Sequence, residues 1–259
     1  MRTSLRRGAG RAAFAAVPLL LAACATAPRP TPISTSRLGV AKATGTVARG
    51  VVQLEAGYSR GHQDGRTRES FGETLLRVGL GPRTEARIGL SSYQRTVTPA
   101  ATVEGIGDPS LVVKHRVHDL AGGLPAVAVT VGSTVPIGSD RMGAGAFQPE
   151  AGLFTEWKLP VGFKGLAMAS FRDAIAAGDR YGQTTLAAGA RRALTDRTLA
   201  QAEYIHVAST RAGAADVNQL RAGAALRVTS NLQLDAWTAR STAAGVHEFL
   251  FGVGFAHRW

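Results

Sequence analysis

The sequence has a single cysteine among 259 residues, which excludes a disulfide framework and any metal site built on several thiolates. Charged residues are scarce at 19%, and aromatic residues make up only 6%. The chain also lacks the long apolar blocks of a helical membrane protein. At 45% hydrophobic residues it is nevertheless too apolar to remain disordered. These absences indicate a folded chain that relies on neither disulfides nor membrane helices.

The first 23 residues have the features of a secretory signal. An apolar run from Ala12 to Ala23 follows four arginines and no acidic residue, and it is too short to span as a mature helix. It ends in Leu21-Ala22-Ala23-Cys24, which resembles a bacterial lipobox, so we expect Cys24 to be acylated. The alternative is ordinary cleavage after Ala27, but Pro28 would directly follow that cut. Residues 1–23 are therefore predicted to be a lipoprotein-type signal peptide that directs the chain to the bacterial outer membrane.

The excess of positive charge does not indicate a nucleic-acid partner. Losing the four arginines of the signal lowers the formal charge from +12 to +8. The remaining charge is spread along the chain, with no basic helix, no zinc-finger spacing and no aromatic RNA-binding motif. We expect no nucleic-acid binding.

Residues 24–49 are rich in Pro, Ser, Thr and Ala, which predicts an extended periplasmic tether. Beyond it, over residues 50–259, apolar residues alternate with small or polar ones. In 247–259 the apolar residues share one parity, so only a period of two separates the two faces. No segment sustains a 3.6-residue apolar period, so we predict an all-β domain.

The alternating segments recur twelve times. The expected strands are 50–60, 69–80, 85–94, 105–117, 125–135, 147–157, 162–172, 181–193, 198–208, 216–228, 232–240 and 247–259. Tight connections such as 81–84 alternate with longer ones such as 61–68, 139–146 and 210–215. This pattern predicts a transmembrane antiparallel up-and-down β-barrel with its amino terminus on the periplasmic side. The chain is too short for a separate plug domain.

The face opposite the apolar one carries charges of both signs, as a polar lumen would. The lumen candidates are Glu73, Arg77, Arg87, Asp108, Lys114, Arg116, Glu203, Arg221, Arg227 and Asp235. Two interpretations stay open for the basic residues: a wall that attracts anions, or a ladder paired with Glu73, Glu85, Glu203 and Asp235 that fills a narrow barrel. Asp108 either faces the lumen near Lys114 and Arg116 or caps a turn beside its glycines.

Aromatic residues cluster near the ends of the expected strands, which fits girdles at the lipid headgroups. They are Phe71, Tyr93, Trp157, Tyr181 and Trp237. The chain ends on Trp259, with Phe251 and Phe255 at the same parity, and this resembles the signal by which outer-membrane barrels are assembled. Outer-membrane lipid and the barrel-assembly machinery are therefore the expected partners, beside a small-molecule solute.

Three stretches together carry a family resemblance. They are Leu76-Arg77-Val78-Gly79-Leu80 with Glu85-Ala86-Arg87-Ile88, Gly105-Ile106-Gly107-Asp108-Pro109-Ser110-Leu111-Val112-Val113-Lys114, and Val131-Gly132-Ser133-Thr134-Val135-Pro136-Ile137-Gly138-Ser139. They resemble the outer-membrane barrels of the meta-pathway of phenol degradation family, a transporter-like group, over roughly residues 50–259. The resemblance implies movement of small, often hydrophobic, molecules across the outer membrane.

The sequence gives little support to an enzyme, a metal or a cofactor. The six histidines show no metal-binding spacing of the HExxH kind. An outer-membrane phospholipase would need a serine nucleophile and its base on one strand face, as in His-x-Ser, and no such motif occurs. His206 and Ser209 are three apart, which puts them on opposite faces.

The main hypothesis is therefore a transporter-like channel for small, including hydrophobic or aromatic, solutes. One alternative is a non-conducting structural or binding barrel whose lumen charges are fully paired. A second alternative is a soluble periplasmic β-sandwich lipoprotein, in which the apolar faces would lie between two stacked sheets.

Overall fold

The computed structural model describes residues 32–90 and 92–259. The predicted signal peptide and Cys24 lie outside these residues. Within them no helix is long and apolar enough to cross a bilayer. The described chain forms β1 (Val52–Gln63), β2 (Arg66–Gly79), β3 (Thr84–Gly89), β4 (Tyr93–Val97), β5 (Thr102–Ile106), β6 (Ser110–His118), β7 (Ala126–Thr134), β8 (Gln148–Lys158), the 3₁₀ turn η1 (Pro160–Gly162), β9 (Phe163–Ala176), β10 (Asp179–Ala193), β11 (Thr198–Ser209), β12 (Val217–Arg227), β13 (Leu232–Ala243) and β14 (Val246–Arg258).

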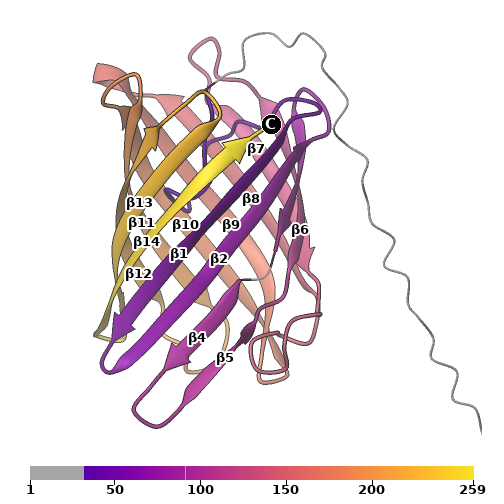
Figure 1. Cartoon of the computed structure of the whole chain (residues 1–259), viewed down its shortest axis with the longest axis vertical. Helices are drawn as coiled ribbons and strands as arrows, with labels where there is room; N and C mark the ends of the chain where they lie inside the picture. The colour runs from indigo at the N-terminus through magenta and orange to yellow at the C-terminus, as the bar shows by residue number, and fades with distance from the viewer. Residues whose placement is uncertain (1–31, 91) are drawn as a thin grey trace, which may run out of the picture. The chain divides into compact units, whose positions relative to one another are not determined.

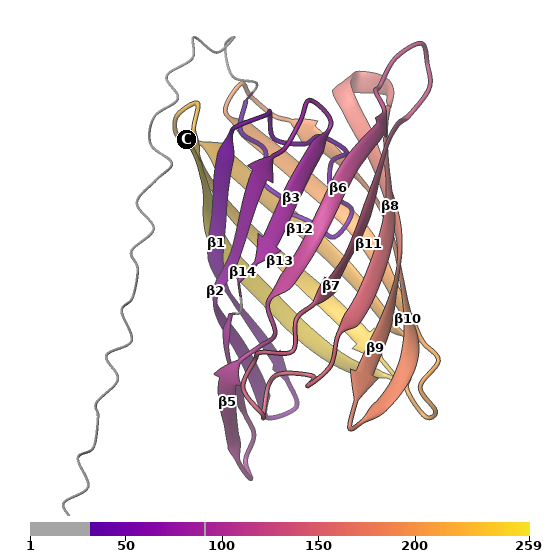
Figure 2. The same ribbon diagram turned by 90° about the vertical axis from the view of Figure 1, so that its right-hand side faces the viewer.

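The strands close into a single antiparallel ring, as Figures 1 and 2 show. β1 pairs with β14 on one side and with β2 on the other, so the sheet meets itself. Twelve strands make the ring, and β4 and β5 form an additional hairpin on its edge. The predicted twelve-stranded barrel is confirmed, and the β-sandwich alternative is wrong.

Two of the expected strands are each split in two. The expected strand 85–94 becomes β3 and β4, which pair with different parts of β2. The expected strand 105–117 becomes β5 and β6, separated by Gly107-Asp108-Pro109. Proline has no amide proton for a sheet ladder, which explains the interruption at this point. The β4–β5 hairpin consequently projects beyond the rest of the barrel (Figure 2).

The predicted contrast between tight and long connections holds only in part. Instead of a long loop over 61–68, β1 and β2 are joined by the two residues Asp64-Gly65, both with positive φ. Ala177-Gly178 and Ala244-Gly245 make the same kind of turn. Two positive-φ residues are what a type I′ hairpin requires, and an Asp-Gly pair is a strong sequence signal for it. The longer loops at this end are 135–147 and 210–216.

The barrel wall is apolar outside and polar inside. On β13, Leu234 is 46% exposed on the outside, whereas Gln233 and Asp235 are buried inside. Phe251 and Phe255 of β14, and Trp259 directly after it, face outward with the other apolar residues of this strand. This distribution is the reverse of a soluble protein and fits a wall in contact with lipid.

A β-bulge in β2 changes which residues face the lumen. The pairing of β1 with β2 shifts register between Glu55 and Gly57, opposite Gly72 and Glu73, and both of these residues have positive φ. Phe71 is exposed on the outside, where its ring lies 5.0 Å from that of Tyr58. Strict alternation would put Phe71 and Glu73 on the same face, so the bulge is what turns Glu73 inward.

Candidate functional site

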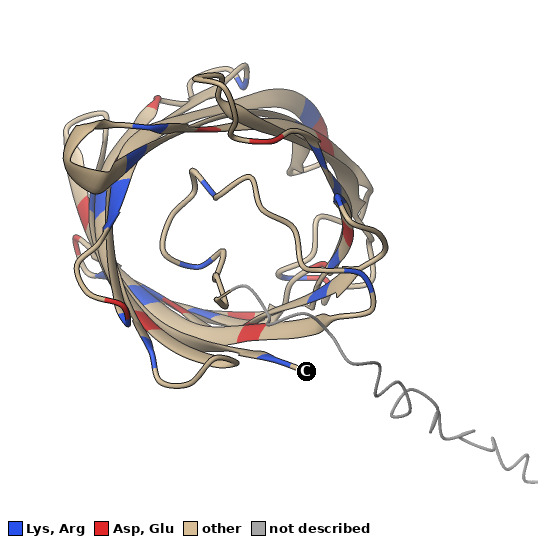
Figure 3. Ribbon diagram, turned by 90° about the horizontal axis from the view of Figure 1, so that it is seen from above, with Lys and Arg blue, Asp and Glu red and all other residues tan. Residues whose placement is uncertain are grey.

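Residues 32–49 lie inside the barrel, so the predicted periplasmic tether is wrong for this part of it. We call them the lumen segment; Figure 3 shows it as a curved trace within the ring. Its apolar side chains are buried against the interior, although proline, serine and threonine dominate the surrounding sequence. The buried apolar members are Ile33, Leu38, Ala41 and Val47, and the polar Thr44 is buried with them.

The lumen segment first contacts the wall formed by β1 and β2. The hydroxyl of Thr35 and the amide of Ser36 donate hydrogen bonds to the Glu55 carboxylate at 3.0 and 2.8 Å. Arg77 donates to the carbonyl of Ser34 at 3.0 Å. Glu55 and Arg77 are both buried, and hydrogen bonds to charged groups in such a site are strong.

Arg37 then joins two parts of the wall. Its guanidinium lies 3.0 Å from the Glu73 carboxylate on β2 and 3.2 Å from that of Asp235 on β13. Arg221 on β12 donates to the carbonyl of Arg37 at 2.7 Å and lies over the ring of Trp237, 3.6 Å from its centroid. Trp237 therefore faces the lumen, and its predicted place in a lipid-facing girdle is wrong.

The lumen segment next reaches the opposite wall and turns back. The amides of Val40 and Ala41 donate to the Glu203 carboxylate on β11 at 2.7 and 3.0 Å. Lys114 on β6 donates to the carbonyls of Ala43 and Gly45. The segment is thus hydrogen-bonded to strands on both sides of the ring and crosses the bore.

A cluster of buried charges holds the returning end of the segment. The amide of Val47 donates to the Glu85 carboxylate at 2.7 Å. Arg77 lies between Glu85 and Glu55, at 2.8 and 3.1 Å, and Arg87 lies 3.4 Å from Glu85. Glu55 and Glu85 are fully buried, so each carboxylate depends on these partners to offset its lost hydration.

Part of the interior is apolar. Ala41 of the lumen segment has no exposed surface and packs against side chains from β7 to β11. The other members of this cluster are Ala128, Phe154, Leu166, Met168, Ala187 and Ile205. Apolar contact therefore adds to the hydrogen bonds that hold the segment across the bore.

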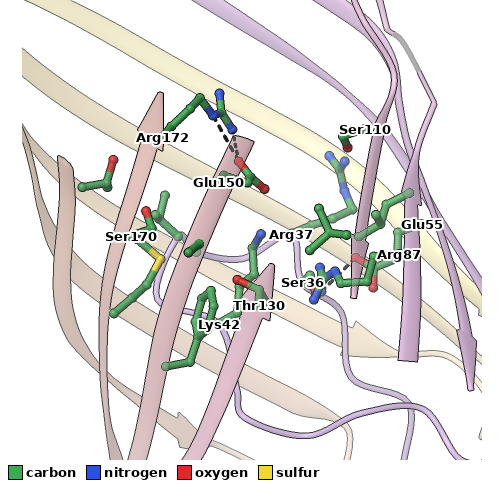
Figure 4. Close-up of a pocket in the computed structure, with 18 of the residues that line it drawn as sticks. Ser36, Arg37, Lys42, Glu55, Arg87, Ser110, Thr130, Glu150, Ser170 and Arg172 are labelled. Carbon is green, nitrogen blue, oxygen red and sulfur yellow. Dashed lines mark hydrogen bonds and ion pairs between the residues drawn. The ribbon is translucent and has the colours of Figure 1, made fainter. Parts of the chain in front are cut away.

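Two cavities flank the lumen segment. The larger, of about 560 Å³, is bordered by Ser36–Lys42 residues of the segment and by β1–β3, β6–β10, β12 and β13. We call it the central cavity; Figure 4 shows its charged and hydroxyl side chains. The other, of about 470 Å³, lies beside Pro32–Ser34, the turns before β9 and β11, and the adjoining ends of β12 and β13. The two have no lining residue in common, so the segment separates two spaces within the barrel.

Seven of the ten predicted lumen residues lie around the lumen segment, and Arg116, Arg227 and Asp108 do not. Those at the segment are Glu73, Arg77, Arg87, Lys114, Glu203, Arg221 and Asp235. Arg116 lies 3.0 Å from Asp119 near a turn, and Arg227 donates to the carbonyl of Asp196 at 2.7 Å. These two lie at the turn end of the barrel rather than at the crossing.

Asp108 caps a loop that is distant from it in the sequence. Its carboxylate accepts hydrogen bonds from the amides of Gly138 and Ala144 at 2.8 and 2.7 Å. These amides belong to the 135–147 loop, so Asp108 fixes that loop over the break between β5 and β6. A Cβ on Gly138 would lie 2.7 Å from the Asp108 carboxylate, so the close approach requires glycine there. Of the two interpretations of Asp108, capping therefore agrees with its contacts. The capped loop is 135–147, however, and not the turn that contains Asp108.

Several interior residues were not anticipated from the sequence. Arg37 and Lys42 lie in the segment that was expected outside the barrel.

In the described part of the chain, no group of three or more His, Cys, Asp or Glu side chains is placed to hold a metal ion.

The fold resembles solved outer-membrane barrels. The COG4313 outer membrane channel from Pseudomonas putida F1 aligns with a TM-score of 0.65 and 14% identity, over 88% of this chain and all of that one. The NanC porin aligns with a TM-score of 0.57 and 7% identity, over 80% and 98%. The KdgM porin in complex with disordered oligogalacturonate aligns with a TM-score of 0.51 and 9% identity, over 79% and 98%. At such identities the likeness concerns the fold.

No curated protein matches the chain with significant sequence similarity. A family model does match, and it extends from inside the lumen segment to the carboxyl terminus. Because the model described as "Putative MetA-pathway of phenol degradation" covers residues 35–259, the chain belongs to that family.

Proposed function

We propose that this protein is an outer-membrane channel for small solutes, including hydrophobic and aromatic ones, whose bore is restricted by its own lumen segment. One observation carries the proposal: an apolar outer wall surrounds a charged interior that contains two cavities of about 560 and 470 Å³. A barrel with this polarity is stable in lipid, and its polar interior gives solutes a route across the membrane. The lumen segment narrows that route to small molecules.

The ends of the chain support an orientation. The Trp259 amide donates to the Val52 carbonyl, and the Arg258 amide donates to the Asn231 carbonyl, so the start of β1 and the carboxyl terminus lie at the end of the barrel that has the 228–231 turn. The opposite end carries the 135–147 loop and the projecting β4–β5 hairpin. The end with the 135–147 loop also has two-residue turns at Asp64-Gly65, Ala177-Gly178 and Ala244-Gly245, but it carries the longest connection of the barrel wall among the described residues. In outer-membrane barrels the longer loops are extracellular, which supports a periplasmic position for the start of β1 and the carboxyl terminus.

The non-conducting barrel is the second candidate, and the crossing of the bore favours it. Hydrogen bonds to β1, β2, β3, β6, β11, β12 and β13 hold the lumen segment. A segment held so widely could close the barrel to solutes entirely. The two candidates differ in whether the complete mature chain conducts.

Reconstitution of the mature chain into planar bilayers separates them. We expect a small, steady conductance for the full barrel, and uptake of small aromatic solutes into vesicles that contain it. The gel mobility difference between heated and unheated samples checks that the reconstituted barrel is folded. Folded protein that gives neither conductance nor solute uptake would reject the channel and favour the non-conducting barrel.

A further inference from the structure

Lys42 stands apart from the other charged groups of the interior. It belongs to the lumen segment and borders the central cavity (Figure 4). Among the described residues its ammonium has no ion-pair or hydrogen-bond partner, whereas Arg37 of the same segment contacts two carboxylates. A cation enclosed by the barrel without a counter-ion is costly, and such a group is characteristic of a binding site.

The acidic residues of the central cavity are already occupied. Glu73 accepts hydrogen bonds from Arg37 and from the Ser59 hydroxyl. Glu150 pairs with Arg172, whose Nε lies 3.1 Å from the carboxylate. The third acid, Glu55, is bound by Arg77 and by the lumen segment itself. Lys42 is therefore left as a cation that an anion from outside the chain can neutralise.

The remaining lining suits an amphipathic molecule. The hydroxyls of Thr130, Ser170 and Thr185 border the cavity, and in the described structure they make no hydrogen bond to the protein. Apolar side chains face the same space: Leu75, Val112, Phe154 and Met168. A volume of about 560 Å³ lies in the range of small-molecule sites, which combine apolar walls with a few polar groups that fix orientation.

We propose that the central cavity is a binding site for a small organic acid with an apolar or aromatic body, whose carboxylate pairs with Lys42. Arg221 also borders the cavity without a carboxylate partner in the described chain, but the carbonyls of the lumen segment and the ring of Trp237 already occupy its guanidinium. Among the described lining residues Lys42 thus offers the free cation, and one ammonium matches the single charge of a monocarboxylate better than a phosphate or a dicarboxylate. The hydroxyls of Thr130, Ser170 and Thr185 are available to the carboxylate or to polar substituents, and the apolar wall receives the body. This inference rests on the proposed channel, because it names the solute class that the interior receives.

The charge of Lys42 depends on pH near neutrality. Burial, and next the positive charge of Arg87, lower the pKa of the Lys42 ammonium to about 8. Its protonated form therefore predominates below that pH and is lost as the pH rises through it. The charged groups that act on it come from five strands: Glu55 of β1, Arg77 of β2, Arg87 of β3, Lys114 of β6 and Glu150 of β8.

Calorimetric titration of the folded full barrel in detergent micelles with benzoate tests the site. We expect benzoate to bind at pH 6.5, and the neutral isostere benzamide to bind at least about tenfold more weakly, as befits loss of a hydrogen bond to a charged group. Raising the pH to 9.5 should weaken benzoate binding by a similar factor, because Lys42 then loses its proton. Benzoate itself stays ionised throughout this range.

Two variants and a control identify the cation. Lys42→Met should bind benzoate at least about tenfold more weakly at pH 6.5 and lose the pH dependence. Lys42→Arg should retain binding at pH 9.5, because a guanidinium stays charged there. Lys158→Met is the matched control, since Lys158 is exposed at the end of β8, and it should leave the affinity unchanged.

Equal affinity of the parent barrel and Lys42→Met, or of benzoate and benzamide, would overturn the inference. Binding in micelles does not require conduction, so the outcome is independent of the channel proposal. Conductance without Lys42-dependent benzoate binding would reject the site and leave the channel, whereas such binding without conductance would reject the channel and leave the site.

Discussion

Deletion of residues 32–49 is expected to raise the single-channel conductance several-fold. The lumen segment crosses the bore from Glu55 on one wall to Glu203 on the other, so it forms the narrowest part of the passage. Its removal joins the two cavities that it separates. The wall charges left behind then face water rather than protein, so their loss of partners is offset by hydration. Conductance in planar bilayers at fixed salt measures the change.

Two single substitutions keep the test independent of the deletion. Ala41→Asp puts a carboxylate at a fully buried position beside Glu203, which should displace the segment and raise conductance in the same direction. Gly45→Ala is its matched control, because a Cβ there meets no atom within 4 Å. Heat-modified gel mobility confirms that each barrel is folded. A folded deletion variant with the conductance of the parent would show that the segment does not restrict the passage.

Arg77→Met is expected to lower the free energy of unfolding by about 3–5 kcal/mol, the usual cost of breaking a buried ion pair by removing one partner. Arg77 neutralises two carboxylates with no exposed surface, at 3.1 Å from Glu55 and 2.8 Å from Glu85. Methionine fills similar space but leaves Glu55 without an ion-pair partner among the described residues and Glu85 with only Arg87, at 3.4 Å. Urea unfolding in lipid vesicles measures the loss.

Arg83→Met is the matched control for this prediction. Arg83 pairs with Asp119 at the surface, where both side chains are more than 40% exposed, so its loss should cost at most about 1 kcal/mol. Adding Glu85→Gln to Arg77→Met removes one of the two buried negative charges that Arg77 neutralised and should recover part of the stability. If Arg77→Met and Arg83→Met proved equally stable, the buried cluster would not hold the barrel together.

The wall of the barrel was readable from the sequence because its signal is local. Each strand must put apolar residues toward lipid and polar residues toward the lumen, so parity alone locates the strands and assigns most of the lumen residues. Gly72 is where that rule fails, because a bulge reverses parity between Phe71 and Glu73. The sequence indicates the interruption between β5 and β6 only through the general tendency of proline, here Pro109, to interrupt strands.

The lumen segment was not readable because nothing local marks it. Proline-rich chain without periodicity has the same appearance in a tether and in a barrel interior. The only signals were the apolar residues Ile33, Leu38 and Val47 within it, and the abundance of acids on the inner wall. Such acids can equally be paired with neighbouring strands.

The expected charge ladder shows how the segment changes the outcome. Glu203 and Arg221 are direct neighbours in the β11–β12 register, as a ladder requires. Yet Glu203 accepts from the amides of Val40 and Ala41, and Arg221 donates to segment carbonyls. The wall charges therefore bind backbone groups of the lumen segment instead of one another. The buried amides and carbonyls of the segment require hydrogen bonds, and the wall charges supply them.

Amide hydrogen exchange of the lumen segment in the reconstituted barrel tests most directly whether it occupies the bore. The amides of Val40, Ala41 and Val47 donate to the buried carboxylates Glu203 and Glu85. We predict that they exchange about a hundredfold or more slowly than in an unstructured peptide, since exchange requires local opening of these contacts. Exchange of all three at the rate of a free peptide would place the segment outside the lumen and contradict the account.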